Sequence, residues 1–196
     1  MHSMADFFIP LDPFSKQRDW VVKDFPDLDY SLSLRPVYIP DDLRTLHRWV
    51  HAPATNINTV DSGDQGRLLR HYKNILSSSR GQSFVVLRKE KPVCQFDLKG
   101  TETDPLYFLV PTNADDRVLT CLIPEASLHS KIWMQGLDLL LGLYFVLPDA
   151  GAVFIPAPRY PRVFADDLEE MGFASYGEME EMDPLTILLF KRNRYK

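Results

Sequence analysis

Seven consecutive residues, Glu125 to Lys131, stand between a β-rich run and a very apolar stretch that favours a helix. The N–H groups that open a helix have no partner inside it, and together with the helix dipole they attract phosphates. Ser127 has the side chain of a helix cap, and Lys131 adds positive charge. The segment has no glycine, which would ease close approach of the backbone to a phosphate. The sequence therefore leaves two interpretations open, a phosphate-binding loop and a capped helix start.

Three acidic or basic side chains, one on an earlier predicted strand and two in this segment, are candidates for proton transfer or for binding an anion. Asp97 shares one face of a predicted strand with Gln95, and this face could line a cleft. The alternative is that the face is exposed to solvent, as polar strand faces more often are. Glu125 is a second candidate base, and its alternative is an ordinary favourable charge at a helix start. His129 could contact a phosphate, although a loop histidine is usually exposed.

The sequence predicts no metal site. His47 and His51 have the spacing of two residues on one helical face, but the stretch reads "HRWVH" and lacks the central glutamate of a zinc protease. No third ligand accompanies the two histidines.

Hydrophobic periodicity and turn residues predict the elements that must position these side chains. Strands are predicted at 30–37, 83–88, 93–98, 106–110, 117–123, 152–156 and 186–192, and helices at 40–53, 65–76, 132–147 and 162–173. The turn of the first hairpin is expected at Lys89 to Pro92. Gly136 and Gly142 are expected to allow close packing of the apolar helix. The order of elements predicts a mixed sheet with helices around it.

Length and composition indicate one ordinary globular domain. The chain has 196 residues and a formal net charge of −5, with a pI near 5.5, which argues against a nucleic-acid partner. Residues 1–30 are expected to form an extended lead-in, and residues 31–196 a single domain. Cys94 and Cys121 lie in apolar runs and are expected to be buried free thiols.

No membrane partner is expected. The longest apolar stretch, Leu137 to Leu147, contains Asp138 and is shorter than the roughly 20 residues of a spanning helix. The N-terminus lacks a basic segment followed by a long apolar core, so the predicted location is the cytoplasm.

Three stretches, in the same order, resemble the GNAT (GCN5-related N-acetyltransferase) superfamily. "LRPVYIPDDLRTLHRWVHAP" and "DRVLTCLIPE" are similar to the first strand and helix and to the central strand of its aerobactin-type siderophore acyltransferases. "DDLEEMGF" resembles the end of the last helix in the wider family. The resemblance covers about residues 31–192. It implies an α+β fold, in which a mixed, mostly antiparallel sheet is flanked by helices.

The resemblance also implies acetyl-CoA or another acyl-CoA as the donor. In that family the central strand and its parallel neighbour splay apart, the pantetheine arm lies in the gap, and the pyrophosphate lies on the loop before the next helix. The matching positions assign the cofactor to the end of the strand and the loop. They are Leu122, Ile123, Ser127, Leu128, His129, Ser130 and Lys131.

Both acid–base positions of the siderophore branch differ in this chain. Thr120 stands where the usual histidine of the central strand would be, and its hydroxyl could orient a substrate but not accept a proton near neutral pH. The segment "IPAPRYPRVF" replaces the stretch that carries the companion aspartate. Thr120, Asp97 and Glu125 are therefore the catalytic candidates.

The function that follows is transfer of an acyl group from acyl-CoA to a small amine or hydroxylamine, with siderophore biosynthesis as one setting. The alternative is a catalytically inactive binding or regulatory module with the same fold, which would explain the missing histidine and aspartate. Binding of acyl-CoA discriminates the two. The expected acceptor is a small molecule, and the sequence leaves open whether the chain forms a homodimer.

Overall fold

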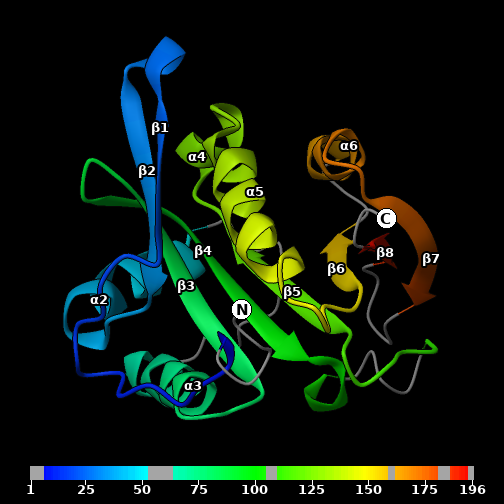
Figure 1. The fold of residues 1–196 in the computed structure, drawn as a ribbon, viewed down its shortest axis with the longest axis horizontal. Helices are drawn as coiled ribbons and strands as arrows, with labels where there is room; N and C mark the ends of the chain where they lie inside the picture. The colour runs from blue at the N-terminus through cyan, green and yellow to red at the C-terminus, as the bar shows by residue number, and fades with distance from the viewer. Residues whose placement is uncertain (1–6, 53–63, 105–109, 159–161, 181–185, 194–196) are drawn as a thin grey trace.

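In the residues that the structure describes, the protein is built on an eight-stranded mixed sheet, seen in a computed structural model (Figure 1). These residues are 7–52, 64–104, 110–158, 162–180 and 186–193. The order across the sheet is β1-β2-β3-β4-β5-β6-β8-β7, and only β5 and β6 are parallel neighbours. The strands are β1 (Val21–Phe25), β2 (Tyr30–Pro36), β3 (Gly81–Arg88), β4 (Lys91–Gly100), β5 (Arg117–Leu122), β6 (Val153–Pro158), β7 (Ala174–Glu180) and β8 (Thr186–Arg192).

Helices cover both faces of the sheet (Figure 1). They are α2 (Ile39–Val50), α3 (Gln65–Leu76), α4 (Glu125–His129), α5 (Ile132–Phe145) and α6 (Arg162–Glu170), with 3-10 turns at Pro26–Leu28 and Thr101–Thr103. α2 and α3 pack on the face that carries Val85 and Leu122. α5 and α6 pack on the opposite face, where the rings of Trp133 and Phe164 have centroids 4.8 Å apart. The predicted mixed sheet with surrounding helices is confirmed.

The α5 helix is the central helix of the larger core. Eight of its fourteen residues are buried, which is why its sequence is apolar on nearly every face. A Cβ atom at Gly136 would lie 2.9 Å from Cγ2 of Val86, so this glycine does permit close packing. The same expectation is wrong for Gly142, where a Cβ would meet nothing within 4 Å because the residue faces outward.

Local patterns predicted most of the remaining elements. The hairpin is confirmed, with Lys89 and Glu90 between the strands at φ 47° and 65°, as in a two-residue primed turn. Gly172 ends the last helix with a φ of 82°. Cys94 and Cys121 are buried free thiols, and burial raises the pKa of both.

Three elements differ from the prediction. β1 and β7 form edge strands where none is expected, and the segment before α5 contains the short helix α4 instead of a loop. The predicted strand at 106–110 lies, except for Val110, outside the described residues. None of the helices described here has the length and apolar character of a membrane span.

Candidate active site

β5 and β6 separate soon after they begin. The last of their parallel pairs joins Val118 to Phe154, and no later pair joins these strands in the described residues. β6 instead pairs with β8 along its length, and its Pro156 and Pro158 lack the N–H groups that a second ladder would need. We call the opening between the two strands beyond these pairs the fork. Thr120 lies on β5 beside it, and the splayed strands agree with the family resemblance.

A buried polar network lies on β4, on the face covered by α2 and α3. Asp97 is only 1% exposed, and its Oδ1 accepts a hydrogen bond of 2.6 Å from Ser83 Oγ. Gln95 Nε2 donates to Ser83 Oγ at 3.0 Å and also contacts Asp97 Oδ1. Nε2 of His71, on α3, lies 2.9 Å from Asp97 Oδ2. The alternative of a solvent-exposed polar face is wrong, because α3 covers this face.

The network keeps the Asp97 carboxyl ionised. Burial alone would raise its pKa, but the hydrogen bond and charge of His71, followed by the Ser83 hydroxyl, outweigh burial and lower the pKa below the ordinary value. Asp97 therefore acts on His71 as a fixed negative charge. A carboxylate in this position orients an imidazole and stabilises it after it gains a proton.

His71 also has an accessible side. Its side chain is 29% exposed and lines a cavity of about 290 Å³ together with Asn74 and Lys99. Because Nε2 faces Asp97, Nδ1 is the ring nitrogen left for a ligand. The hydroxyl of the neighbouring Tyr72 is buried and has no hydrogen-bond partner in the described residues. Burial, followed by the charges of Asp97 and Asp42, raises the pKa of this tyrosine, so it stays protonated.

Thr120 joins this constellation through strand register. It is the pairing partner of Asp97 in the antiparallel β4–β5 ladder, so both side chains project from one face. Thr120 is half-buried. The structure thus brings together two of the three predicted catalytic candidates, Thr120 and Asp97, on neighbouring strands, with Thr120 beside the fork.

His71 is the functional residue that the sequence analysis misses. The available signal is its position in α3, three residues after Leu68 and four before Ile75, which are both buried. That spacing puts His71 on the inward face of the helix. Pairing with a carboxylate 26 residues away is a tertiary contact that periodicity cannot reveal.

The predicted phosphate loop is folded on itself. The N–H groups of Leu128, Ser130 and Lys131 already donate to backbone carbonyls of this segment, at 3.0 to 3.2 Å. The N–H groups of Ile132 and Trp133, in the first turn of α5, donate no hydrogen bond within the described part of the chain. The amide donors without a partner in the described residues therefore follow directly after the predicted segment, and they belong to nearly buried residues, at 5% and 0% exposure.

Ser127 is not a helix cap, contrary to the sequence hypothesis. Its Oγ donates to the carbonyl of Val93, and Pro124 occupies the N-cap position of α4. Ser127 is buried, so its side chain turns toward β4 rather than toward the helix end. The hydroxyl ties α4 to the start of β4.

Lys131 is bound to α6. It has a φ of 53°, and its Nζ lies 2.9 Å from Asp167 Oδ1 and 3.0 Å from Glu170 Oε2. The hydrogen bond to Asp167, and then that to Glu170, raise the pKa of Lys131. Its charge is balanced inside the protein, and a phosphate would have to compete with two carboxylates for it.

The next residues that the sequence analysis assigns to catalysis or to the cofactor lie on α4 or directly after it. Glu125 is exposed, and its Oε1 lies 3.5 Å from Nε2 of the equally exposed His129, so Glu125 does not join the Asp97 network. Ser130 is exposed, with its Oγ donating to Ala126 at 2.9 Å. Leu128 is half-buried, packed against the larger core.

Leu122 and Ile123 face opposite sides of the sheet. Leu122 belongs to the core under α2 and α3, and Ile123 to the core under α5. Both are nearly inaccessible, at 3% and 0% exposure, so neither presents an open surface to a cofactor.

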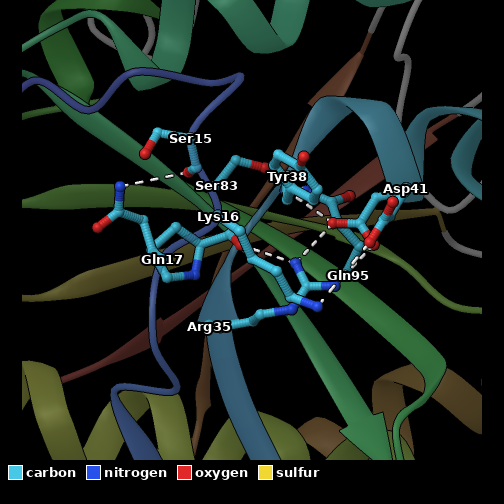
Figure 2. A network of polar contacts seen from close by, with 10 residues as sticks. Ser15, Lys16, Gln17, Arg35, Tyr38, Asp41, Ser83 and Gln95 are labelled. Carbon is cyan, nitrogen blue, oxygen red and sulfur yellow. Dashed lines mark hydrogen bonds and ion pairs between the residues drawn. The ribbon is translucent and has the colours of Figure 1, made fainter.

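A second buried ionic group joins β2 to α2. Arg35 makes a bidentate pair with Asp42, at 2.7 and 2.9 Å, and Asp42 also accepts from the Tyr38 N–H at 2.7 Å. Figure 2 shows Arg35 directed toward the start of α2, where Tyr38 and Asp41 lie. This group lines a cavity of about 690 Å³ and holds the helix that covers the Asp97 face.

The described residues contain no cluster of three or more side chains that could hold a metal ion.

No protein-family model and no curated protein sequence matches this chain. Solved structures do match. An uncharacterized protein from Bacillus halodurans has a TM-score of 0.77 at 20% identity, over 88% of this chain and 89% of its own. The aminoglycoside acetyltransferase AAC(6')-Ib in complex with coenzyme A has a TM-score of 0.71 at 15% identity, over 83% and 95%.

A spermidine N-acetyltransferase chimera from Vibrio cholerae and hSSAT has a TM-score of 0.67 at 14% identity, over 83% of this chain and 95% of its own. These similarities establish the fold: the chain has the mixed sheet and flanking helices of the GNAT acyl-CoA N-acyltransferases. The predicted fold class is confirmed.

Proposed function

We propose that the chain is an N-acyltransferase that uses an acyl-CoA donor and a small amine or hydroxylamine acceptor. The single observation that carries this proposal is the position of the His71–Asp97 pair. Asp97 lies on the strand face that Thr120 shares, on β4, which is next to β5, the strand that separates from β6. A base held by a carboxylate beside an open strand is what attack on a thioester requires.

In the proposed complex the donor lies along the fork. The open edge of β5 beyond Val118 provides backbone groups for an amide-rich arm such as pantetheine. The positive end of the α5 dipole, which begins at Ile132, favours the pyrophosphate. The similarity to a fold that binds coenzyme A in AAC(6')-Ib supports this choice of donor.

The proposed chemistry is direct attack by the acceptor nitrogen on the thioester carbonyl. Nδ1 of His71 takes the proton of the attacking nitrogen, and Asp97 stabilises the resulting imidazolium. The C–N bond forms and the C–S bond breaks, and the sulfur leaves as the thiol of coenzyme A after taking the proton that His71 received from the nitrogen. Thr120 orients the acceptor, while Asp97 is a positioning residue because it is buried and fully engaged.

A hydroxylamine acceptor is the finer part of the proposal. It rests on the resemblance to siderophore acyltransferases, whose acceptors are of the hydroxylysine type. Two of the similar structures are an aminoglycoside acetyltransferase and a spermidine N-acetyltransferase, so an amine acceptor is equally compatible with the fold.

The test has a binding stage and a turnover stage. Calorimetric titration with coenzyme A and acetyl-CoA establishes the donor site. Release of the coenzyme A thiol is then followed with a panel of amines and hydroxylamines that includes a hydroxylysine-type compound. Binding plus acceptor-dependent release supports the proposal. Absence of any coenzyme A binding would contradict it and favour a non-catalytic binding module.

A further inference from the structure

A cavity of about 530 Å³ opens between the β3–β4 hairpin, the end of α2 and the start of α4. Arg88, Lys89 and Lys91 line it together with the indole of Trp49. No carboxylate is among its lining residues in the part of the chain that the structure describes. The His71–Asp97 pair involves a later part of β4 and does not account for this concentration of cations.

Within the described residues, the positive charge of the hairpin is not balanced by a carboxylate. Lys89 and Lys91 have no ion-pair partner in the described residues. The guanidinium of Arg88 lies 4.3 Å from the centre of the Tyr30 ring rather than against a carboxylate. Glu90, the acid of the hairpin, lines a different cavity. Three cations thus meet one cavity in a chain whose net charge is −5.

The walls of the cavity are fixed by the fold. Lys89 and Glu90 occupy a tight turn with positive φ, which sends their side chains to different sides of the hairpin. On the opposite wall, the hydrogen bond from Ser127 to the Val93 carbonyl holds α4 against β4. The indole of Trp49 adds a flat apolar surface that suits a ring or a sugar.

We propose that this cavity binds a phosphate group, with Arg88, Lys89 and Lys91 as its charge partners. Arginine presents paired donors to phosphate oxygens, and lysine supplies a compact charge. The phosphate has two chemical sources. It belongs to the nucleotide end of coenzyme A, in which case the inference rests on the proposed function, or to a separate phosphorylated ligand.

Titration calorimetry with adenosine 3′,5′-bisphosphate and with inorganic phosphate tests the site. The double variant Lys89→Glu/Lys91→Glu is expected to weaken binding of these probes by at least about tenfold, since two charge-assisted contacts become repulsive. Lys23→Glu is the matched control, an exposed charge reversal on β1, and should bind as the parent does. All three lysines are exposed, so the charge reversals should leave the fold intact. Thermal unfolding of the variants checks this.

Coenzyme A and dephospho-coenzyme A identify the source. If the double variant loses affinity for coenzyme A but not for dephospho-coenzyme A, the phosphate is that of the donor. If only the free phosphate probes lose affinity, a separate ligand is bound. Equal binding of the phosphate probes by the parent and the double variant, or none by the parent, overturns the inference. Both of these results come from the phosphate probes alone. Binding of coenzyme A itself is a separate measurement, and that measurement tests the proposed function.

Discussion

Nε2 of His71 lies 2.9 Å from Oδ2 of Asp97 and joins the α3 helix to the middle of β4. The carboxylate is buried and the imidazole is not, so the pair presents one ring nitrogen to solvent while the other is fixed. Thr120, opposite Asp97 in the sheet, places this pair next to the fork. The sheet register, and not proximity in sequence, therefore assembles the candidate site.

Stability in acid should depend on Asp97. Because its folded-state pKa lies below the ordinary value of 3.8, its contribution to stability is present above that value and is lost as the pH falls through the lowered pKa. The free energy of unfolding, measured with urea between pH 6 and 2, should fall less steeply for Asp97→Asn than for the parent. Parallel pH profiles would contradict the ionised state assigned to Asp97.

Breaking the Arg35–Asp42 pair should be costly, because the side chains of both partners are nearly buried, at 7% and 2% exposure. Asp42→Asn is expected to lower the free energy of unfolding by about 3–5 kcal/mol, since it leaves an uncompensated buried guanidinium. The adjacent Asp41 provides the control. Its contact with Lys16 is 3.9 Å long and exposed, so Asp41→Asn should change stability far less. Similar effects in urea denaturation would refute this distinction.

Two glycines of α5 should respond in opposite directions to alanine. Gly136→Ala forces a Cβ against Val86 and should destabilise the protein by about 1–3 kcal/mol. Gly142→Ala meets no neighbour and should stabilise the helix by up to about 1 kcal/mol. Chemical denaturation of both variants gives the comparison. A neutral Gly136→Ala would mean that the helix can move away from β3.

The ion pair between Lys131, at the start of α5, and Asp167, on α6, should stabilise the protein, because Asp167 is only 3% exposed. Lys131→Met leaves this carboxylate buried without its cation and should lower the melting temperature. Adding Asp167→Asn should restore part of the loss, which a double-mutant cycle by thermal unfolding measures. Glu170→Gln is the exposed control. Additive losses would show that the pair is not coupled.

The sequence predicts the elements whose signals are local. Periodicity identifies α3 and α5, and the apolar runs around Lys89 and Glu90 identify the hairpin, because side-chain spacing alone carries that information. β1 is missed since it is an edge strand with exposed middle residues, and its register exists only against β2. The helix α4 is missed because its five residues are too few to show a helical period.

The site is harder to predict than the fold. Asp97 and Thr120 are both candidates from sequence, but only the β4–β5 register shows that they share a face. Ser127 looks like a helix cap, and its true partner is the carbonyl of Val93, 34 residues earlier. Hydrogen bonds between distant segments decide these roles, and they have no local signature.

The measurement that tests the central claim most directly is the pH dependence of kcat for His71→Gln, with the acceptor found in the panel. Glutamine can still donate to Asp97 but cannot take a proton. We expect kcat to fall by about 100- to 10 000-fold, the acid limb of the profile to disappear, and the KM for acyl-CoA to stay the same. A parental kcat and pH profile in His71→Gln would contradict the role assigned to the His71–Asp97 pair.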